Sequence, residues 1–217
     1  MLTTAQATTM LMLQAQMNAK VNPEWIKAAY PYLRAVIVEG AEAKEHRGWK
    51  WWKKQECDLK QLQMELVDIW HFTLSHILLQ HGGDQETSLT ELLHSDTADC
   101  VRFDGVDYSI ACLDLVGKLE LNIGLAAAKR ISLPLFAALL HDCEMDWNEL
   151  YCQYVGKNVL NFFRQDNGYK TGTYQKTWGG QEDNVHLVAL MDQLTREGVA
   201  ADDLPTGLYQ GLQARYQ

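Results

Sequence analysis

Two pairs of acidic residues in the sequence could share one metal ion or more, Glu39 with Glu42 and Glu65 with Asp68. The members of each pair are three residues apart, so in a helix their carboxylates lie on the same face. Two such helices packed together would bring four carboxylates to one place. Clustered negative charges are unfavourable unless a cation lies among them, and carboxylate oxygens suit Mg²⁺ or Mn²⁺ better than zinc or copper. The spacing therefore predicts a magnesium site.

Helices are predicted on both sides of that site. Apolar residues at helical spacing indicate helices over residues 4–20 and 59–79. A helix is also expected from residue 32 to about residue 47, where Gly48 is placed to end it. On the helix over 59–79, Glu65, Asp68 and Phe72 form a stripe beside the apolar face. That position, at the edge of what a bundle would bury, is where the lining of a cleft is expected.

The rest of the chain also favours helices. Asn22, Pro23 and Glu24 indicate the start of a helix that Pro31 interrupts, and further helices are expected over about 110–130, 132–154, 157–164 and 185–197. No convincing run of alternating residues predicts strands. We therefore predict an all-α fold, a helical bundle with its active site between packed helices. The 217 residues are expected to form a single domain, with 85–145 as a candidate mobile subregion.

Composition narrows the classes of function. Hydrophobic residues make up 47% and charged residues 22%, which is ordinary for a folded globular protein. The net charge of −9 argues against broad binding to nucleic acid or to an anionic membrane. Five cysteines without a Cys-x-x-Cys pair indicate neither a disulfide framework nor a zinc site. No apolar run is long enough to span a bilayer, so we expect a cytoplasmic protein.

One segment has the opposite charge. Between residues 154 and 178 there are four cations, Lys157, Arg164, Lys170 and Lys176, against the single acid Asp166. Several glycines make the part after residue 164 loop-like. Glycines and cations together are typical of a phosphate-binding segment, and the absence of a Walker pattern or dinucleotide fingerprint means that side chains would form it.

Several motifs occur together in one order: Glu39-x-x-Glu42, W-K-W-W at 49–52, E-L-V-D-I-W-H-F at 65–72, K-N-x-L-N-x-F-R at 157–164 and G-Y-K-x-G-x-Y-x-K-x-W at 168–178. This combination resembles the dimeric all-α dUTPases, which belong to the all-α nucleoside triphosphate pyrophosphatases with the MazG-like proteins. The resemblance covers about residues 10–80 and 150–187. A Glu-x-x-Glu pair alone is common on helix surfaces, whereas the ordered set is specific.

The resemblance implies a Mg²⁺-dependent homodimeric hydrolase, with Mn²⁺ as a substitute, that converts dUTP to dUMP and pyrophosphate by attack of a metal-activated water. It also implies that dUDP is converted to dUMP and phosphate. The implied metal ligands are Glu39, Glu42, Glu65 and Asp68. Either Glu39 or Glu42 would orient or deprotonate the water.

The resemblance also assigns the nucleotide contacts, and the last segment of one subunit could complete the partner's site. The implied base-binding residues are Gln14, Asn18, Trp51 and Phe72, with Trp49 as a substitute for Trp51. The implied phosphate- and sugar-binding residues are Lys157, Asn158, Asn161, Arg164, Tyr169, Lys170, Tyr174 and Lys176.

Alternatives remain open at the level of sequence. The amides of Gln14 and Asn18 can match a uracil edge, but rotated they can match cytosine, so a dCTP-preferring or broader pyrophosphatase of the same fold is the first alternative. A noncatalytic helical interaction protein with an acidic cleft is the second. His71, beside the acidic stripe, is expected to be a buried hydrogen-bonded histidine rather than a ligand.

Overall fold

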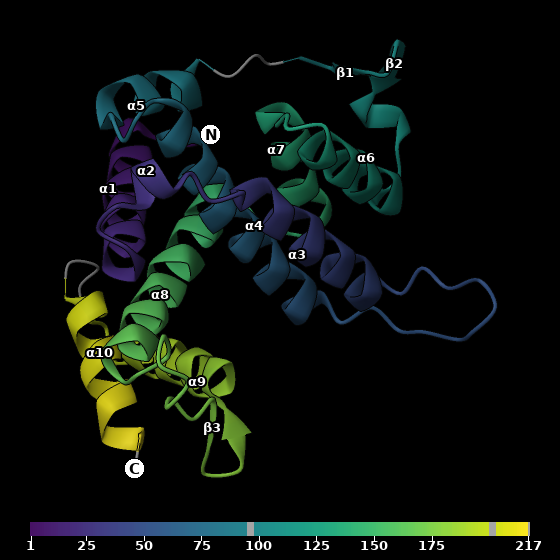
Figure 1. The fold of residues 1–217 in the computed structure, drawn as a ribbon. Helices are drawn as coiled ribbons and strands as arrows, with labels where there is room; N and C mark the ends of the chain where they lie inside the picture. The colour runs from purple at the N-terminus through teal and green to yellow at the C-terminus, as the bar shows by residue number, and fades with distance from the viewer. Residues whose placement is uncertain (95–97, 200–202, 217) are drawn as a thin grey trace.

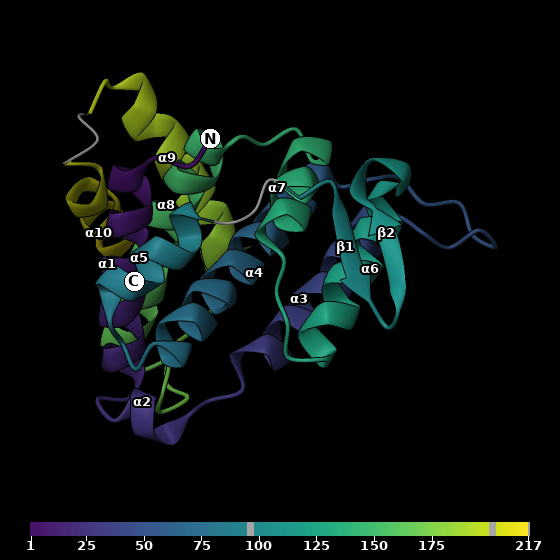
Figure 2. The same cartoon turned by 90° about the horizontal axis from the view of Figure 1, so that it is seen from above.

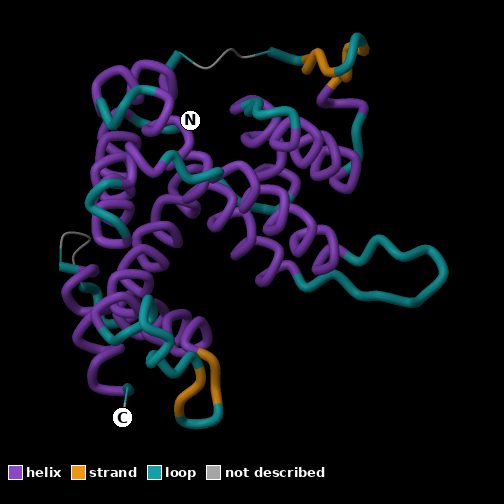
Figure 3. Tube along the Cα trace, in the orientation of Figure 1, coloured by secondary structure: helices purple, strands orange, loops and turns teal. Residues whose placement is uncertain are grey.

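The computed structural model describes residues 1–94, 98–199 and 203–216, and its regular structure is mainly helical (Figures 1 and 3). The described helices are α1 (Thr4–Val21), α2 (Trp25–Ala28), α3 (Tyr32–Arg47), α4 (Leu59–Gln80), α5 (Gln85–Leu93), α6 (Leu115–Ala127), α7 (Leu133–Asp142), α8 (Trp147–Asp166), α9 (Asp183–Arg196), α10 (Leu204–Arg215) and the 3₁₀ turn η1 (Ile110–Cys112). Two antiparallel hairpins join them, β1 (Cys100–Phe103) with β2 (Val106–Ser109) and β3 (Thr177–Trp178) with β4 (Gln181–Glu182). The predicted all-α class is confirmed.

Helices α3 and α4 lie side by side at the centre of the molecule (Figures 1 and 2). The apolar face of α4 is buried, and Leu62, Leu66 and Ile69 have no exposed surface. Gly48 ends α3 in the left-handed region with a φ of 74°, as predicted. Asp58 then caps α4 by accepting a hydrogen bond from the backbone N–H of Gln61. The two helices are therefore fixed against each other on either side of the protruding 49–57 connection.

Helix α6 packs closely on the other side of α3. A Cβ atom added to Gly40 would lie 2.7 Å from Cγ1 of Ile123, a distance too short for two carbon atoms. A glycine is therefore required where these two helices approach. This contact lies between Glu39 and Glu42 in the sequence, so it sets the position of the helical turn that bears them.

Helices α1 and α8 complete the core next to α4. The buried Tyr154 of α8 donates a hydrogen bond to the backbone oxygen of Met10 in α1, at 2.9 Å. Trp70 of α4 stacks on Phe136 of α7, with ring centroids 4.9 Å apart. These contacts bring polar residues of α1, α3, α4 and α8 around one space.

A second apolar cluster holds the end of α8 against α9 and α10. It is built around Phe163 and Trp178, which are 1% and 5% exposed, with Leu187 and Leu212 from the two C-terminal helices. This cluster anchors the loop after α8 and the β3–β4 hairpin. The C-terminal helices therefore fix the end of α8 that is nearest to the cleft.

The structure divides one predicted helix and extends another. The helix expected over 132–154 is two helices, α7 and α8, because Glu144 adopts a φ of 56° and Asp146 caps α8 by accepting from the N–H of Glu149. The short helix expected over 157–164 is the second half of the continuous α8. Lys157 and Arg164 therefore lie on a rigid helix.

Other expected boundaries also differ. Helix α2 begins at Trp25 rather than after Asn22, and α6 begins at Leu115, where Asp114 caps it. Residues 85–93, for which no helix was predicted, form α5. Both hairpins went unpredicted because their strands are only two to four residues long. In the part of the chain that the structure describes, no helix is both long and apolar enough to cross a membrane.

Candidate active site

A cleft of about 570 Å³ opens between α1, α3, α4 and α8. Acidic side chains from α3 and α4 and cationic side chains from α8 line it. Polar side chains of α1 and α4 meet inside it. Its lining residues are Gln14, Met17, Asn18, Val21, Tyr30, Pro31, Tyr32, Ala35, Glu39, Asp68, His71, Phe72, Ser75, Lys157, Asn161, Arg164, Gln165 and Tyr169.

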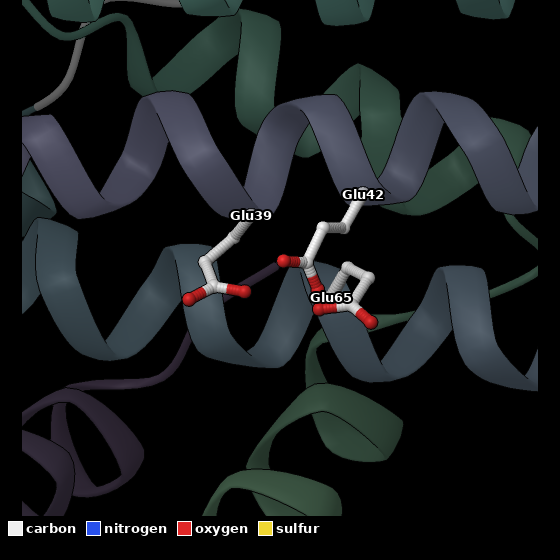
Figure 4. Close-up of side chains that lie close together, drawn as sticks. All are labelled: Glu39, Glu42 and Glu65. Atoms are coloured by element: carbon white, nitrogen blue, oxygen red, sulfur yellow. The ribbon is translucent and has the colours of Figure 1, made fainter.

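Three carboxylates converge where α3 faces α4. Glu39 and Glu42 of α3 and Glu65 of α4 each place one oxygen so that all three oxygens lie within 4.8 Å of one another (Figure 4). The predicted helical spacing thus brings both members of the first pair and the first member of the second pair together. Asp68, one turn after Glu65, lines the cleft outside that close group.

The carboxylates of Glu39, Glu42, Glu65 and Asp68, here called the acidic group, repel one another. Burial raises the pKa of the Glu39 carboxyl, and the negative charges of Asp68, Glu65 and Glu42 raise it further. The pKa of Glu65 is raised by burial and then by the charge of Asp68. A divalent cation would remove this repulsion, and an all-oxygen donor set is what Mg²⁺ and Mn²⁺ prefer. The residues present therefore fit such an ion.

The cations of α8 are already paired with carboxylates. Nζ of Lys157 lies 2.9 Å from Oδ2 of Asp68, and both side chains are largely buried. Arg164 forms a bidentate pair with Asp183, through Nε at 2.7 Å and Nη2 at 2.8 Å. Its Nη1 donates to the side-chain oxygen of Asn161 at 3.2 Å. The cleft thus has cations beside its acids, each held in a fixed direction.

A buried hydrogen-bond network lies at the α1 side of the cleft. The amide nitrogen of Gln14 donates to Oγ of Ser75 at 2.8 Å and to Oδ1 of Asn18 at 3.1 Å. The amide oxygen of Gln14 lies 2.9 Å from the Tyr154 hydroxyl, whose single proton it shares with the backbone oxygen of Met10, and pairs with Nδ1 of His71 at 2.8 Å. Gln14 therefore has a fixed orientation, with all four contacts made inside the protein.

The same network assigns the protonation of His71. Burial, helped by the charge of Lys157, lowers the pKa of His71 to about 3, so the ring is neutral at pH 7. Because Nδ1 faces an acceptor oxygen of Gln14, Nδ1 carries the proton and Nε2 is a bare acceptor. Among the described residues, neither Nε2 of His71 nor Nδ2 of Asn18 has a hydrogen-bond partner, although both are buried. One acceptor and one donor of this network are thus unpaired. The expectation of a buried, hydrogen-bonded histidine is confirmed.

The aromatic residues that were expected to contact the nucleotide base lie in two different places. Phe72 lines the cleft, together with Tyr30 and Tyr32. Trp51 does not line it: its side chain is 89% exposed in the connection between α3 and α4, where it packs edge-on against Trp52. Trp49, the expected substitute, packs under Lys44 in the same region. The reason is that Gly48 ends α3 and directs the following residues away from the helix pair.

Of the predicted phosphate- and sugar-binding residues, some line the cleft and others do not. Lys157, Asn161, Arg164 and Tyr169 line the cleft, whereas Asn158, Lys170, Tyr174 and Lys176 do not. The buried Asn158 lies off the lined face of α8, and the ammonium of Lys170 bonds to the backbone oxygen of Val21. Tyr174 donates to Asp183, and Lys176 pairs with Glu182 in the β3–β4 hairpin. Sequence order placed all eight in one segment, but α8 turns only one face to the cleft.

The residues that sequence reasoning missed include a serine that lines the cleft and an acid that lies behind it. Ser75 continues the cleft-facing stripe of α4 from Asp68 and Phe72, so helical periodicity could have found it. Asp183, with no exposed surface, is the partner of Arg164. Its sequence context, between a glycine turn and a helix, carries no signal of that pairing.

Comparison with known proteins adds one finding. A family model described as dUTPase matches residues 6–169, which include most of α1 and all of α3, α4 and α8. The match thus covers every cleft-lining residue and ends before Asp183. The search against curated proteins produced no match.

Proposed function

The chain belongs to the all-α dUTPase family and is a dUTP diphosphatase, and from this we propose that the cleft hydrolyses dUTP to dUMP and pyrophosphate and dUDP to dUMP and phosphate. The observation that carries this assignment is the composition of the cleft. The carboxylates of Glu39 and Asp68, cations held in ion pairs, and polar side chains that include Asn18 and His71 line the same space. A nucleoside polyphosphate requires that combination. Its phosphates need cations and a metal ion held by carboxylates, whereas its base needs neutral hydrogen-bonding groups.

Glu39, Glu42, Glu65 and Asp68 would hold Mg²⁺, or Mn²⁺ in its place. When bound, the metal supplies positive charge against the phosphates and makes water a better nucleophile near neutral pH. The protein itself contributes a proton acceptor. Glu39 is suited to orient the attacking water and take its proton, because it belongs to the converging carboxylates and also lines the cleft. Glu42, which is more exposed, is the second candidate for this role.

Lys157 and Arg164 would face the phosphate chain from α8. The pyrophosphate leaving group carries negative charge that these cations stabilise. Asn161 and Tyr169 lie on the same wall and supply neutral hydrogen-bonding groups. We assign these four residues to the phosphates and the sugar.

His71 and Asn18 would read the base. Uracil has an N3–H donor beside carbonyl acceptors, so it can donate to Nε2 of His71 and accept from Nδ2 of Asn18. Cytosine lacks the proton on N3, which would set two acceptors against each other. Gln14 cannot rotate to compensate, because four contacts hold its amide. This network favours uracil, and Phe72 supplies an apolar wall for the ring.

We also propose that the protein acts as a homodimer. Trp51 and Trp52 are 89% and 57% exposed in the connection between α3 and α4. Large exposed aromatic side chains that adjoin one another are typical of protein interfaces. A second copy of the chain would cover them.

A nucleotide panel tests the proposal. Purified protein with Mg²⁺ should release pyrophosphate from dUTP in preference to dCTP, dTTP and UTP, and phosphate from dUDP. No preference for the uracil deoxynucleotides would contradict the assignment of the base site, and a protein without turnover would support the interaction-protein alternative.

Two matched substitutions test the metal assignment. Glu65→Gln should lower the rate by about 100-fold or more, since even an outer-shell change at a metal site costs about 10–100-fold. Glu45→Gln, on α3 beyond the acidic group, should retain the wild-type rate. Equal rates for the two variants would exclude Glu65 as a ligand.

A further inference from the structure

The side chain of Asp183 is a buried acid behind the phosphate-facing wall of the cleft. It has no exposed surface and lies at the first residue of α9. Both of its oxygens bind the guanidinium of Arg164, at 2.7 Å and 2.8 Å. The Tyr174 hydroxyl donates to its Oδ2 at 3.0 Å. Asp183 does not line the cleft, so it acts there only through Arg164.

The bidentate pair fixes which edge of Arg164 is available. Nε and Nη2 are directed at Asp183, and Nη2 also lies 3.5 Å from Oδ1 of Asn184. Nη1 points the other way, toward the cleft-lining Asn161. A guanidinium is planar, so fixing one edge fixes the direction of the opposite N–H groups. Without Asp183 the arginine would keep its charge but lose this direction.

The pairing also affects the charge that a phosphate meets. Burial favours the neutral form of Asp183, but the hydrogen bonds and charge of Arg164 outweigh burial and keep the pKa of Asp183 below its usual range. The pair is therefore ionised on both sides and has no net charge. Arg164 then contributes directed hydrogen bonds to the cleft rather than a free positive charge.

We propose that Asp183 is a positioning residue that orients Arg164 toward the phosphates of the substrate, with Tyr174 holding Asp183 in turn. This inference rests on the proposed function. It assigns a role in the phosphate site to α9, which lies beyond the region that the family model matches. It also explains why Tyr174, expected at the nucleotide, lies behind the arginine instead.

Asp183→Asn is the primary test, because it keeps the shape of the side chain and replaces one acceptor by an N–H₂ donor that faces the guanidinium. We expect the Kd for inorganic pyrophosphate with Mg²⁺, measured by calorimetry, to rise by about 10- to 100-fold, the range expected for a misplaced binding group. The KM for dUTP should rise in parallel, with a smaller change in kcat. Asp192→Asn, an exposed acid on the same helix, is the matched control and should change neither value.

A double-mutant cycle separates positioning from general destabilisation. Lysine cannot form the bidentate pair, so in an Arg164→Lys background Asp183→Asn should add less than about a twofold further change. Tyr174→Phe removes one hydroxyl only, keeps the ring in its aromatic cluster and should raise the Kd by a few-fold. It serves as the test if Asp183→Asn does not fold.

Two results would overturn the inference. One is a Kd for pyrophosphate within twofold of wild type in Asp183→Asn, or in Tyr174→Phe if that is the variant that folds. The other is a full effect of Asp183→Asn that persists in the Arg164→Lys background. Failure of the proposed function is distinguishable, because a wild-type protein without dUTP turnover would contradict that function while the pyrophosphate cycle still reports on Asp183.

Discussion

The ammonium of Lys157 lies 2.9 Å from Oδ2 of Asp68, so a lysine from α8 is paired with one of the four carboxylates assigned to magnesium. The Lys157 side chain is 5% exposed, and its Nζ also lies 3.4 Å from Oδ1 of Asn184. A cation at this distance competes with a metal ion for the aspartate. If Asp68 turns to the metal, Lys157 becomes available to a phosphate.

Replacement of Lys157 by methionine should therefore affect the two ligands in opposite directions. Mn²⁺ binding, measured by electron paramagnetic resonance, should become several-fold tighter because a competing positive charge is removed. Pyrophosphate binding should weaken by about tenfold or more, since a charge-assisted hydrogen bond contributes roughly 1.5–3 kcal/mol. Lys176→Met, whose ammonium pairs with Glu182 in the β3–β4 hairpin, is the control. Weaker Mn²⁺ binding in Lys157→Met would contradict the competition.

The acidic group predicts an unusual pH dependence of stability without metal. The pKa values of Glu39 and Glu65 are raised in the folded protein, first by burial. The folded state therefore binds more protons than the unfolded state above the ordinary glutamate pKa, and stability falls as the pH rises through the raised values. In EDTA, we expect the Tm to be lower at pH 8 than at pH 6, by a few degrees, and Mg²⁺ to reverse the difference.

Glu39→Gln gives the matching variant for that experiment. Removal of one charge from the group should raise the Tm at pH 8 in EDTA and reduce the stabilisation by Mg²⁺. Glu45→Gln, outside the group, should behave as wild type. A Tm in EDTA that increases from pH 6 to pH 8 would show that the carboxylates do not repel one another in the folded protein.

The buried, neutral His71 should make the folded protein less stable at acidic pH. Its pKa is lowered to about 3 by burial and by the charge of Lys157. Between that value and the ordinary histidine pKa of about 6.5, the unfolded state binds the extra proton, so stability falls as the pH falls below about 6.5. At pH 4.5 the expected contribution of this one residue is on the order of 2 kcal/mol.

Urea unfolding at several pH values measures that contribution. His71→Asn retains an N–H donor for Gln14 and does not titrate, so its stability should fall less steeply than that of wild type between pH 6.5 and 4.5. His94→Asn, at an exposed position, should keep the wild-type slope. Parallel slopes for wild type and His71→Asn would mean that His71 is protonated in the folded protein.

Because α3 and α6 approach closely at Gly40, a larger side chain at this position should destabilise the protein. Gly40→Ala places a Cβ atom 2.7 Å from Cγ1 of Ile123, which should destabilise the protein by about 1–3 kcal/mol in urea unfolding. Ile123→Val in the same chain shortens the side chain that the new atom meets and should recover part of the loss. A fully additive loss in the double variant would show that the two residues do not meet.

The acidic group was predictable from sequence because its geometry is local. Residues three apart share a helix face whatever surrounds the helix, and Gly48 and the leucines of α4 indicated where the two helices lie. The same local rule accounts for Lys157, Asn161 and Arg164, which all line the cleft from α8. The ordered motifs then indicated the family, which the family model confirms.

Contacts between distant residues could not be predicted from spacing. The orientation of Gln14, the tautomer of His71 and the pairing of Arg164 with Asp183 each depend on residues separated by 19 to 140 positions. Trp51 carries a family motif yet lies outside the cleft, because the turn after α3 sets its direction. Periodicity determines which face of a helix a residue occupies, whereas the packing of other helices on that face determines what the side chain meets.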